Sequence, residues 1–258
     1  MSASLEVIVL GSGTSHGIPM IACDCAVCTS ADPRDRRYRA SVAVRLPGGD
    51  VLLIDVSPEF RLAAVACSLD RLDAIALTHA HADHIMGLDD IRRFNTRQQA
   101  SIPCYGNAQT LEIVERCFGY AVGPYRRAER PSVELIDAAE PFAVGDVKVT
   151  PIPLKHGRLD ILGFRIGNFA YCTDCSEIPP ASWPLLADLD VLMLDALRYT
   201  PHPTHLNLPA AVEVAGRLRP RRTVFTHLTH EISHAATSAE LPAGMELAYD
   251  GMRFSARC

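Results

Sequence analysis

The chain has 258 residues, of which 48% are hydrophobic and 21% charged, so it can bury a sizeable core and disorder is not expected. Its formal net charge of −5 argues against a dedicated nucleic-acid binder, although a local basic patch would suffice for contact with phosphates. No apolar run approaches the roughly 20 residues of a membrane span, and no signal peptide accompanies residues 5–10, so we expect a cytoplasmic protein.

Short apolar runs separated by turns organise the first part of the chain. They predict a helix at residues 58–66 and strands at residues 5–10, 41–46, 51–54 and 74–77. A glycine-rich turn at residues 11–15 is either a plain tight turn or a backbone that passes close to a metal or substrate. We expect His16 to face solvent or to support a ligand, and Asp55 to brace a ligand-bearing loop.

Three cysteines stand close together at Cys23-x-Cys25-x2-Cys28, in a chain whose nine cysteines are an odd number. In a reducing cytosol, thiols at this spacing indicate a metal site rather than a disulfide framework. A closed zinc site needs a fourth ligand from elsewhere in the chain and leaves no position open for chemistry. We therefore predict an inserted structural zinc loop at residues 23–28, with a reactive thiol cluster or an iron–sulfur ligand set as the alternatives.

The densest group of polar side chains is Thr-His-Ala-His-Ala-Asp-His at residues 78–84, directly after the strand at 74–77. Apolar residues at 85–94 predict a helix after it, so the polar group occupies a strand-to-helix turn. Imidazole and carboxylate are ligands that Zn, Mn and Fe share. In His79-x-His81-x-Asp83-His84, alternate residues can face one metal while Asp83 and His84 face a second about 3.5–4 Å away. A surface loop without metal is the alternative.

The second part of the chain repeats the order of strands, helix, strand and histidine-bearing loop. We predict helices at residues 107–117 and 208–218, and strands at 133–136, 147–151, 169–174, 191–194 and from 224. Residues 245–254, with Asp250-Gly251 at their centre, predict a terminal hairpin. The irregular segment 119–131 is where a lid would sit. Arginine clusters at 126–130 and 217–222 are expected to be solvated faces, with phosphate steering as the alternative.

Further candidate ligands stand at the ends of these later strands. His156 ends an apolar segment, and Asp174 ends a strand where its carboxylate could bridge two metals. His227 and His230 follow the strand that begins at 224, and both could bind metal, though not necessarily the same ion. Because all of these residues fall at strand ends, we expect two sheets back to back, with helices outside and the metals at one rim.

These motifs resemble the metallo-β-lactamase superfamily over nearly the whole chain. The resemblance is carried by His79-Ala-His81-Ala-Asp83-His84, His156, Asp174 and His227. It implies an α+β fold, the αββα sandwich, as a single domain over residues 1–258. It also implies that His79, His81 and His156 hold one metal, that Asp83, His84 and His227 hold the other, and that Asp174 bridges them.

A closer resemblance is to the phosphoribosyl cyclic phosphate phosphodiesterases of the carbon–phosphorus lyase pathway. Its motifs are the glycine turn at 11–15, the three cysteines, His205-Leu-Asn207 and Thr226-His227-Leu-Thr-His230. This resemblance implies that Cys23, Cys25, Cys28 and His230 form a structural zinc site. It also implies that His205 is the general acid or a phosphate contact. The relatives further suggest a homodimer.

We therefore expect hydrolysis of a small phosphodiester, such as phosphoribosyl 1,2-cyclic phosphate, by a hydroxide that bridges two divalent ions, Mn or Zn. Asp83 would ligate and orient, and His205 would protonate the departing oxygen or stabilise the phosphoryl oxygens. A nucleic-acid substrate is not expected, but a ribonuclease Z-like nuclease or another nucleotide phosphodiesterase is the main alternative. A flavodiiron-type oxidoreductase would have glutamate in place of His81, and a glyoxalase II-type thioesterase would bring a C-terminal helical domain.

Overall fold

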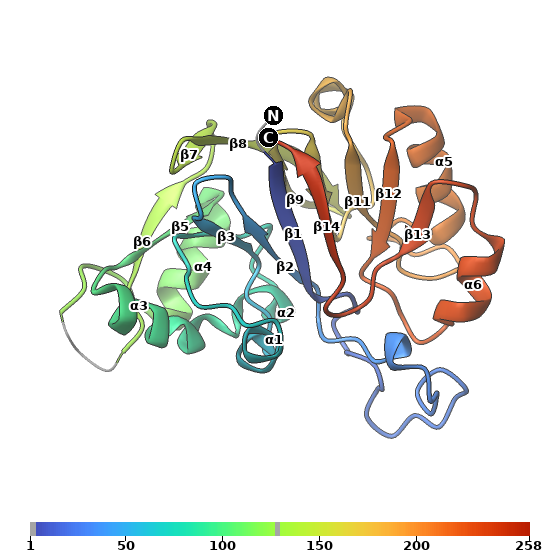
Figure 1. The fold of residues 1–258 in the computed structure, drawn as a ribbon, viewed down its shortest axis with the longest axis horizontal. Helices are drawn as coiled ribbons and strands as arrows, with labels where there is room; N and C mark the ends of the chain where they lie inside the picture. Colours follow the sequence, from blue (N-terminus) through green and yellow to red (C-terminus); the bar gives the residue numbers. More distant parts are fainter. Residues whose placement is uncertain (1–3, 127–129) are drawn as a thin grey trace.

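The computed structural model describes residues 4–126 and 130–258 as two seven-stranded sheets that face each other, with helices on their outer sides (Figure 1). The first sheet contains, in spatial order, β14 (Arg253–Arg257), β1 (Ser4–Gly11), β2 (Ser41–Arg45), β3 (Val51–Ile54), β4 (Ala74–Ala76), β5 (Ile102–Gly106) and β6 (Val133–Asp137). The second contains β13 (Met245–Leu247), β12 (Arg222–Thr226), β11 (Val191–Asp195), β10 (Phe169–Cys172), β9 (Leu159–Ile166), β8 (Val147–His156) and β7 (Phe142–Val144). The predicted αββα sandwich is confirmed.

The helices divide between the outer faces of the two sheets. The first sheet is covered by α1 (Phe60–Ala66), α2 (Ala82–Ile85), α3 (Arg92–Gln98) and α4 (Ala108–Phe118), and α5 (Leu208–Leu218) and α6 (His234–Glu240) lie beside the second (Figure 1). Short stretches of 3-10 helix form η1 (Pro33–Asp35), η2 (Leu88–Ile91) and η3 (Pro180–Leu186). Asparagine side chains cap the N-termini of α4 and α5, which explains why these helices begin where their sequences predict.

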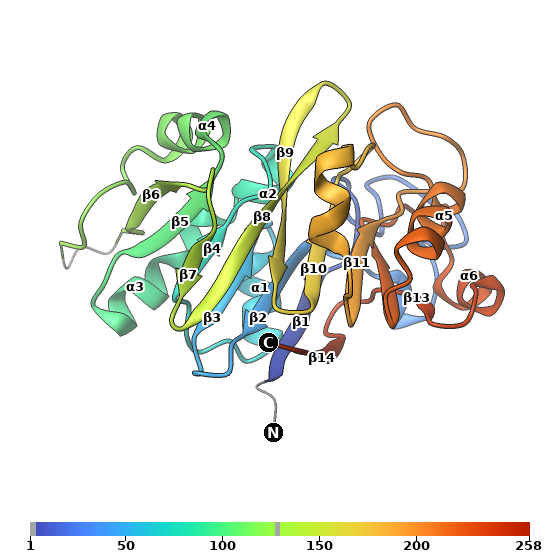
Figure 2. The same cartoon turned by 90° about the horizontal axis from the view of Figure 1, so that it is seen from above.

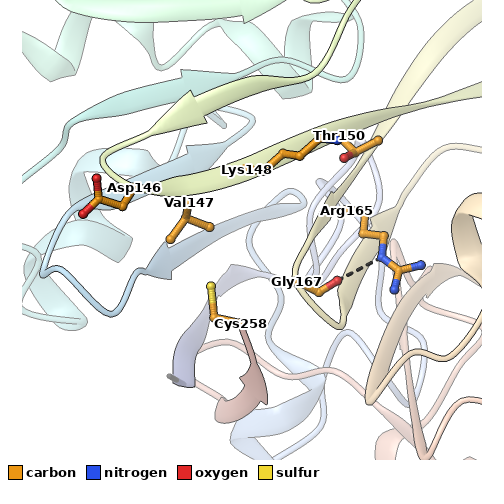
Figure 3. A pocket seen from close by; sticks show the side chains of 7 residues that line it. All are labelled: Asp146, Val147, Lys148, Thr150, Arg165, Gly167 and Cys258. Atoms are coloured by element: carbon orange, nitrogen blue, oxygen red, sulfur yellow. Dashed lines mark hydrogen bonds between the residues drawn. The ribbon is translucent and has the colours of Figure 1, made fainter. Parts of the chain in front are cut away.

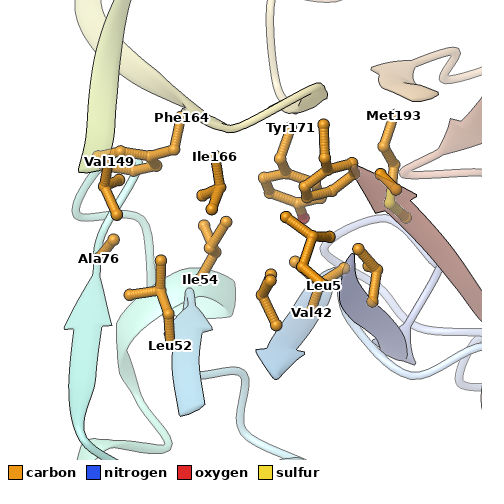
Figure 4. Packing of buried hydrophobic residues seen from close by; sticks show 14 of the residues in the cluster. Leu5, Val42, Leu52, Ile54, Ala76, Val149, Phe164, Ile166, Tyr171 and Met193 are labelled. Atoms are coloured by element: carbon orange, nitrogen blue, oxygen red, sulfur yellow. The ribbon is translucent and has the colours of Figure 1, made fainter. Parts of the chain in front are cut away.

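The main core lies between the two sheets. Figure 4 shows side chains of the first sheet, among them Leu52 and Ile54, facing Val149, Phe164 and Ile166 of the second. The other β3 residues, Val51 and Leu53, point to the opposite face of the sheet, where they pack under the helices. Successive strand residues alternate between the faces of a sheet, so a strand buried on both sides reads as an unbroken apolar run.

Sheet topology brings the candidate ligands to one edge. Strands β3, β4 and β5 run parallel, as do β10, β11 and β12. The strand β8 lies two antiparallel pairings away from β10 and therefore runs in the same direction. The carboxyl ends of these strands meet at one edge of the sandwich, which we call the carboxyl rim. All of the predicted active-site ligands stand on it.

Two predicted elements differ from the structure, and some strands are absent from the prediction. The helix at 85–94 is instead broken into α2, η2 and α3, because Gly87 packs directly against the backbone of Ser57, leaving no room for a Cβ atom. Strands β5, β7 and β9 are not among the predicted elements. The terminal hairpin is wrong: β13 pairs in parallel with β12, whereas β14 pairs with β1 of the other sheet.

The residues between β13 and β14 cross from one sheet to the other, and Asp250 secures the crossing. Its carboxylate accepts hydrogen bonds from Ser12 N (2.9 Å), Ser12 Oγ (2.8 Å) and Tyr38 N (2.6 Å). Open edges on β1 and β12 therefore compete successfully with local pairing of the two terminal strands. Among the described residues, no helix has the length and apolarity that a membrane span requires.

Candidate metal centre

The turn after β4 supplies the first group of candidate ligands. The turn ends where α2 begins, and His81 is the residue immediately before that helix. His79 Nε2 and His81 Nδ1 lie 2.9 Å apart. His156 at the end of β8 and Asp174 after β10 complete the group, and one ligand atom from each of the four lies within 4.8 Å of the others.

A second group shares Asp174 with the first. One ligand atom from each of Asp83, His84, Asp174 and His227 lies within 4.8 Å of the others, and all four residues are buried. His84 Nε2 is 3.2 Å from Asp174 Oδ2, and His227 Nε2 is 3.1 Å from Asp174 Oδ1. Asp174 Oδ2 also lies 3.6 Å from His79 Nε2 of the first group, so the carboxylate faces both groups, as a bridging ligand requires.

The donor atoms of the second group fit a cation. Nε2 of His84 and Nε2 of His227 are buried without a hydrogen-bond partner, and unpaired buried polar atoms are costly. Burial opposes the charged form of His84, but the carboxylates of Asp174, Asp55 and Asp83 outweigh it and raise the pKa of His84 well above its ordinary value. These carboxylates thus favour positive charge at His84, which a proton on the imidazole or a metal ion can supply. A divalent ion would displace that proton, and imidazole with carboxylate suits Zn, Mn or Fe.

Three residues of the rim adopt a left-handed backbone conformation. Asp55, Asp174 and His227 have φ angles of 61°, 57° and 59°, although none of them is glycine. Each follows directly, or after one residue, on a rim strand. Such conformations are costly, and they cluster where a fold fixes side chains for function.

Asp55 has the bracing contacts that its position predicts. Its Oδ2 accepts a hydrogen bond from His84 Nδ1 at 2.7 Å, and its Oδ1 accepts one from Thr78 N at 2.8 Å. The first contact places the proton of His84 on Nδ1 and leaves Nε2 as the candidate donor to a metal. The second fixes the start of the histidine turn.

His205 stands beside both ligand groups and is held by an aspartate that sequence reasoning did not assign. Its ring stacks on that of His227 (centroids 4.9 Å apart, 13° between planes) and lies 4.6 Å from that of His156. Nδ1 of His205 donates to Asp195 Oδ2 at 2.9 Å, and Asp195 is fully buried at the end of β11. Burial and the neighbouring His227 lower the pKa of His205 to about 4. The sequence signal was an acid at a strand end, the same signal that marked Asp174.

The three clustered cysteines meet His230 on the outside of the sandwich. Nδ1 of His230 lies 3.3 Å from Cys23 Sγ, 3.4 Å from Cys25 Sγ and 3.8 Å from Cys28 Sγ. A hydrogen bond from the backbone N–H of Cys28 is the main factor lowering the pKa of the Cys25 thiol, which falls to about 6. The donors could hold a tetrahedral ion, for which three thiolates and one imidazole are a common set.

A buried arginine supports the segment that carries His227 of one candidate metal site and His230 of the other. Arg37 donates to the carbonyl oxygens of Thr229 (2.9 Å) and Ile232 (2.7 Å) and to Asp35 Oδ1 (3.0 Å). The two candidate metal sites therefore share one short segment of chain.

The other sequence motifs contribute no ligand to the two groups, although the glycine turn pairs with Leu228, the residue after His227. A Cβ atom on Gly11 would lie 2.0 Å from the carbonyl oxygen of Arg39, so close backbone packing explains the glycine turn. His16 is exposed. In the segment 119–131, the described residues pack beside β6 and α3 at the outer edge of the first sheet, where Gln99 Nε2 donates to Tyr125 Oη, and residues 127–129 lie outside the described part. Arg221 pairs with Asp190 on the surface, as expected for a solvated face.

A hollow of about 300 Å³ lies near the chain termini and contains none of the candidate ligands (Figure 3). Its lining residues are Asp146, Val147, Lys148, Thr150, Arg165, Gly167 and Cys258. The guanidinium of Arg165 is engaged by the carbonyl oxygens of Gly167 (2.9 Å), Leu185 (2.7 Å) and Ala187 (2.8 Å). This arginine supports the fold, and the chemistry belongs to the carboxyl rim.

Comparison with known proteins agrees with this geometry. A solved structure described as a new diphosphatase from the PhnP family is 43% identical, covers all of both chains and superposes with a TM-score of 0.93. A curated octanoyltransferase of Porphyromonas gingivalis is 35% identical over 96% of this chain, but the match spans only 51% of that protein. This chain thus spans about half the length of that relative. A ribonuclease Z of Mycobacterium sp. is 29% identical over 92% of this chain and 80% of its own length.

The family model described as "Beta-lactamase superfamily domain" matches residues 51–228, a segment that begins with β3 and ends just after His227. It therefore includes the histidine turn and every residue of the two ligand groups. This chain belongs to the beta-lactamase superfamily and has the metallo-β-lactamase fold.

Proposed function

We propose that this protein is a metal-dependent phosphodiesterase that acts on a small molecule, preferably a cyclic phosphodiester such as phosphoribosyl 1,2-cyclic phosphate. The observation that carries the proposal is the likeness, 43% identical over its full length, to a diphosphatase from the PhnP family. Diphosphatases and phosphodiesterases both break a phosphorus–oxygen bond, and the convergent ligands on the carboxyl rim suit that chemistry.

One divalent ion would be held by His79, His81 and His156. The other would be held by Asp83, His84 and His227, and Asp174 would contact both. Mn and Zn are the ions we propose, since imidazole and carboxylate suit either. When bound, such ions lower the pKa of water and neutralise charge on phosphoryl oxygens. Asp55 Oδ2 accepts from Nδ1 of His84, and the carbonyl oxygen of Thr204 accepts from Nδ1 of His156, which would leave Nε2 of each ring free to face an ion.

His205 is the proposed proton donor to the departing oxygen. Asp195 accepts the proton of Nδ1, so Nε2 of His205 is the nitrogen that is free to exchange a proton with substrate. The low pKa of His205 favours its neutral form before substrate binds. A phosphoryl group that gains negative charge beside the ring favours the imidazolium, which readies Nε2 to donate.

We also propose that Cys23, Cys25, Cys28 and His230 bind one structural zinc ion, and that the chain acts as a homodimer. Three thiolates with one imidazole form a closed set, which suits stability rather than catalysis. The zinc would stiffen the segment that carries His227, because that segment also carries His230.

A second candidate substrate class is a diphosphate-bridged diester, and it is favoured by the description of the PhnP-family neighbour as a diphosphatase. The deciding experiment is phosphorus NMR of the Mn- or Zn-loaded protein with phosphoribosyl 1,2-cyclic phosphate, with a dinucleoside diphosphate and with a precursor tRNA. Ring opening to one monoester supports the main proposal, and cleavage of the diphosphate supports the second. Selective cleavage of tRNA would overturn both in favour of the nuclease, and no turnover of any diester would reject the phosphodiesterase class.

A further inference from the structure

A small cavity beside His81 bears on the identity of the substrate. It has a volume of about 140 Å³ and adjoins the first ligand group. Its walls come from the histidine turn, from the first two turns of α4 and from the start of β9. The lining residues are Ala80, His81, Gln109, Thr110, Ile113 and Leu159.

Apart from His81, the candidate metal ligand, the residues that line this cavity are uncharged. Ala80, Ile113 and Leu159 are apolar, and Gln109 and Thr110 are uncharged hydrogen-bonding residues. Among the described residues that line it, there is no lysine, arginine, aspartate or glutamate. Apart from the ion that His81 would hold, the walls offer no cation to offset the loss of water from an anionic group placed deeper in the cavity, which is unfavourable.

The cavity has a fixed shape because its two sides are joined. Asn107 caps α4 by accepting from Thr110 N at 2.8 Å, and its amide donates to the carbonyl oxygen of Asp160 on β9 at 3.0 Å. Figure 2 shows α4 and β9 on the same side of the molecule, next to α2. Lys155 on the neighbouring β8 pairs with Asp160 Oδ1 at 2.5 Å, so its charge is already matched.

We infer that this cavity receives one ester group of the substrate and selects for a compact, uncharged group with hydrogen-bonding capacity near Gln109. The inference rests on the proposed function. A substrate with a second phosphate, such as a phosphorylated ribose, would keep that phosphate outside the cavity. The substrate class is thus a phosphodiester with at least one neutral, ring-sized ester group.

The test compares two symmetric chromogenic diesters. Because the two ester groups of each diester are identical, the charge of the group that enters the cavity does not depend on how the substrate binds. These are bis(4-nitrophenyl) phosphate and its analogue with a 3-carboxylate on each ring. For the metal-loaded wild-type protein, we expect kcat/KM to favour the neutral diester by about tenfold or more. If neither diester is hydrolysed, the proposed function fails, and the cavity is not the cause.

Charged substitutions in the cavity wall distinguish selection by the cavity from a difference in intrinsic reactivity between the two diesters. Ile113→Lys should lower the neutral-to-anionic ratio of kcat/KM by about tenfold or more, and Ile113→Asp should raise it. Leu62→Lys, on an exposed position of α1, is the matched control and should keep the wild-type ratio. Thermal melts show whether each variant is folded. If both folded Ile113 variants keep the wild-type ratio while hydrolysing the diesters, the cavity does not bind the substrate and the inference is wrong.

Discussion

Replacement of Asp195 by asparagine tests how the buried carboxylate of Asp195 controls the protonation of His205 and His227. The carboxylate is fully buried, and its two oxygens face two different imidazoles. Oδ2 is 2.9 Å from His205 Nδ1, and Oδ1 is 3.7 Å from His227 Nδ1. A carboxylate can accept a proton from both rings, whereas asparagine has one acceptor oxygen and a donor amide. Only the contact with His205 is a hydrogen bond, because the 3.7 Å approach of Oδ1 to His227 Nδ1 is too long for one. In Asp195→Asn, the amide nitrogen faces one of the two rings and opposes a proton on Nδ1 of that ring.

Either orientation of the new amide has a measurable consequence. If the amide faces His227, the proton of that ring moves to Nε2, the atom proposed to bind metal. Loss of such an outer acceptor weakens metal binding about 10–100-fold, or about 1.4–2.8 kcal/mol. If the amide faces His205, Nδ1 becomes an acceptor and the imidazolium that would donate its proton from Nε2 loses its stabilising carboxylate, so kcat/KM should fall about 10²–10⁴-fold.

The assay has three readouts on one variant: metal affinity by chelator competition, kcat/KM on bis(4-nitrophenyl) phosphate, and histidine tautomers by nitrogen NMR. The matched control is Asp190→Asn, which makes the same change just before the other end of β11, where Asp190 pairs with Arg257 at 2.6 Å. The control should keep the metal affinity of the wild type. An Asp195→Asn protein with wild-type metal affinity and wild-type kcat/KM would refute the reasoning.

Three further changes have distinct outcomes. Asp174→Ala should bind fewer active-site metal ions and lose most activity; full metal content with full activity would rule out a shared ligand. Cys25→Ser should lose one zinc per chain and melt at a lower temperature, whereas Cys117→Ser, an exposed cysteine of α4, should do neither, as metal analysis and calorimetry can check. Burial raises the pKa of Asp250 from 3.8 to about 7, so the folded state binds a proton that the unfolded state releases between these values. The free energy of unfolding should therefore fall by up to about 1.4 kcal/mol per pH unit as pH rises from 4 to 7. Urea unfolding should show a shallower fall for Asp250→Asn, and parallel curves would contradict the assignment.

Local patterns in the sequence were sufficient for the histidine turn and for most elements. The turn and its ligands lie within seven consecutive residues, so their chemistry and spacing can be read without the fold. Helices α4 and α5 were predicted within one residue because caps and apolar stripes are local signals. The expectation that ligands gather at one rim followed from their places at strand ends.

Partners that are distant in sequence were decided by the tertiary structure. The two terminal strands have good hairpin chemistry around Asp250, yet they join different sheets because β1 and β12 each offer an open edge. The pairing of Asp195 with His205, and the neutral cavity beside His81, likewise depend on which strands become neighbours. Residue type and spacing determine what chemistry a side chain can perform, because these are properties of a short segment. The partner that each side chain meets is set by competition among strand edges across the whole chain, and only the folded sandwich resolves that competition.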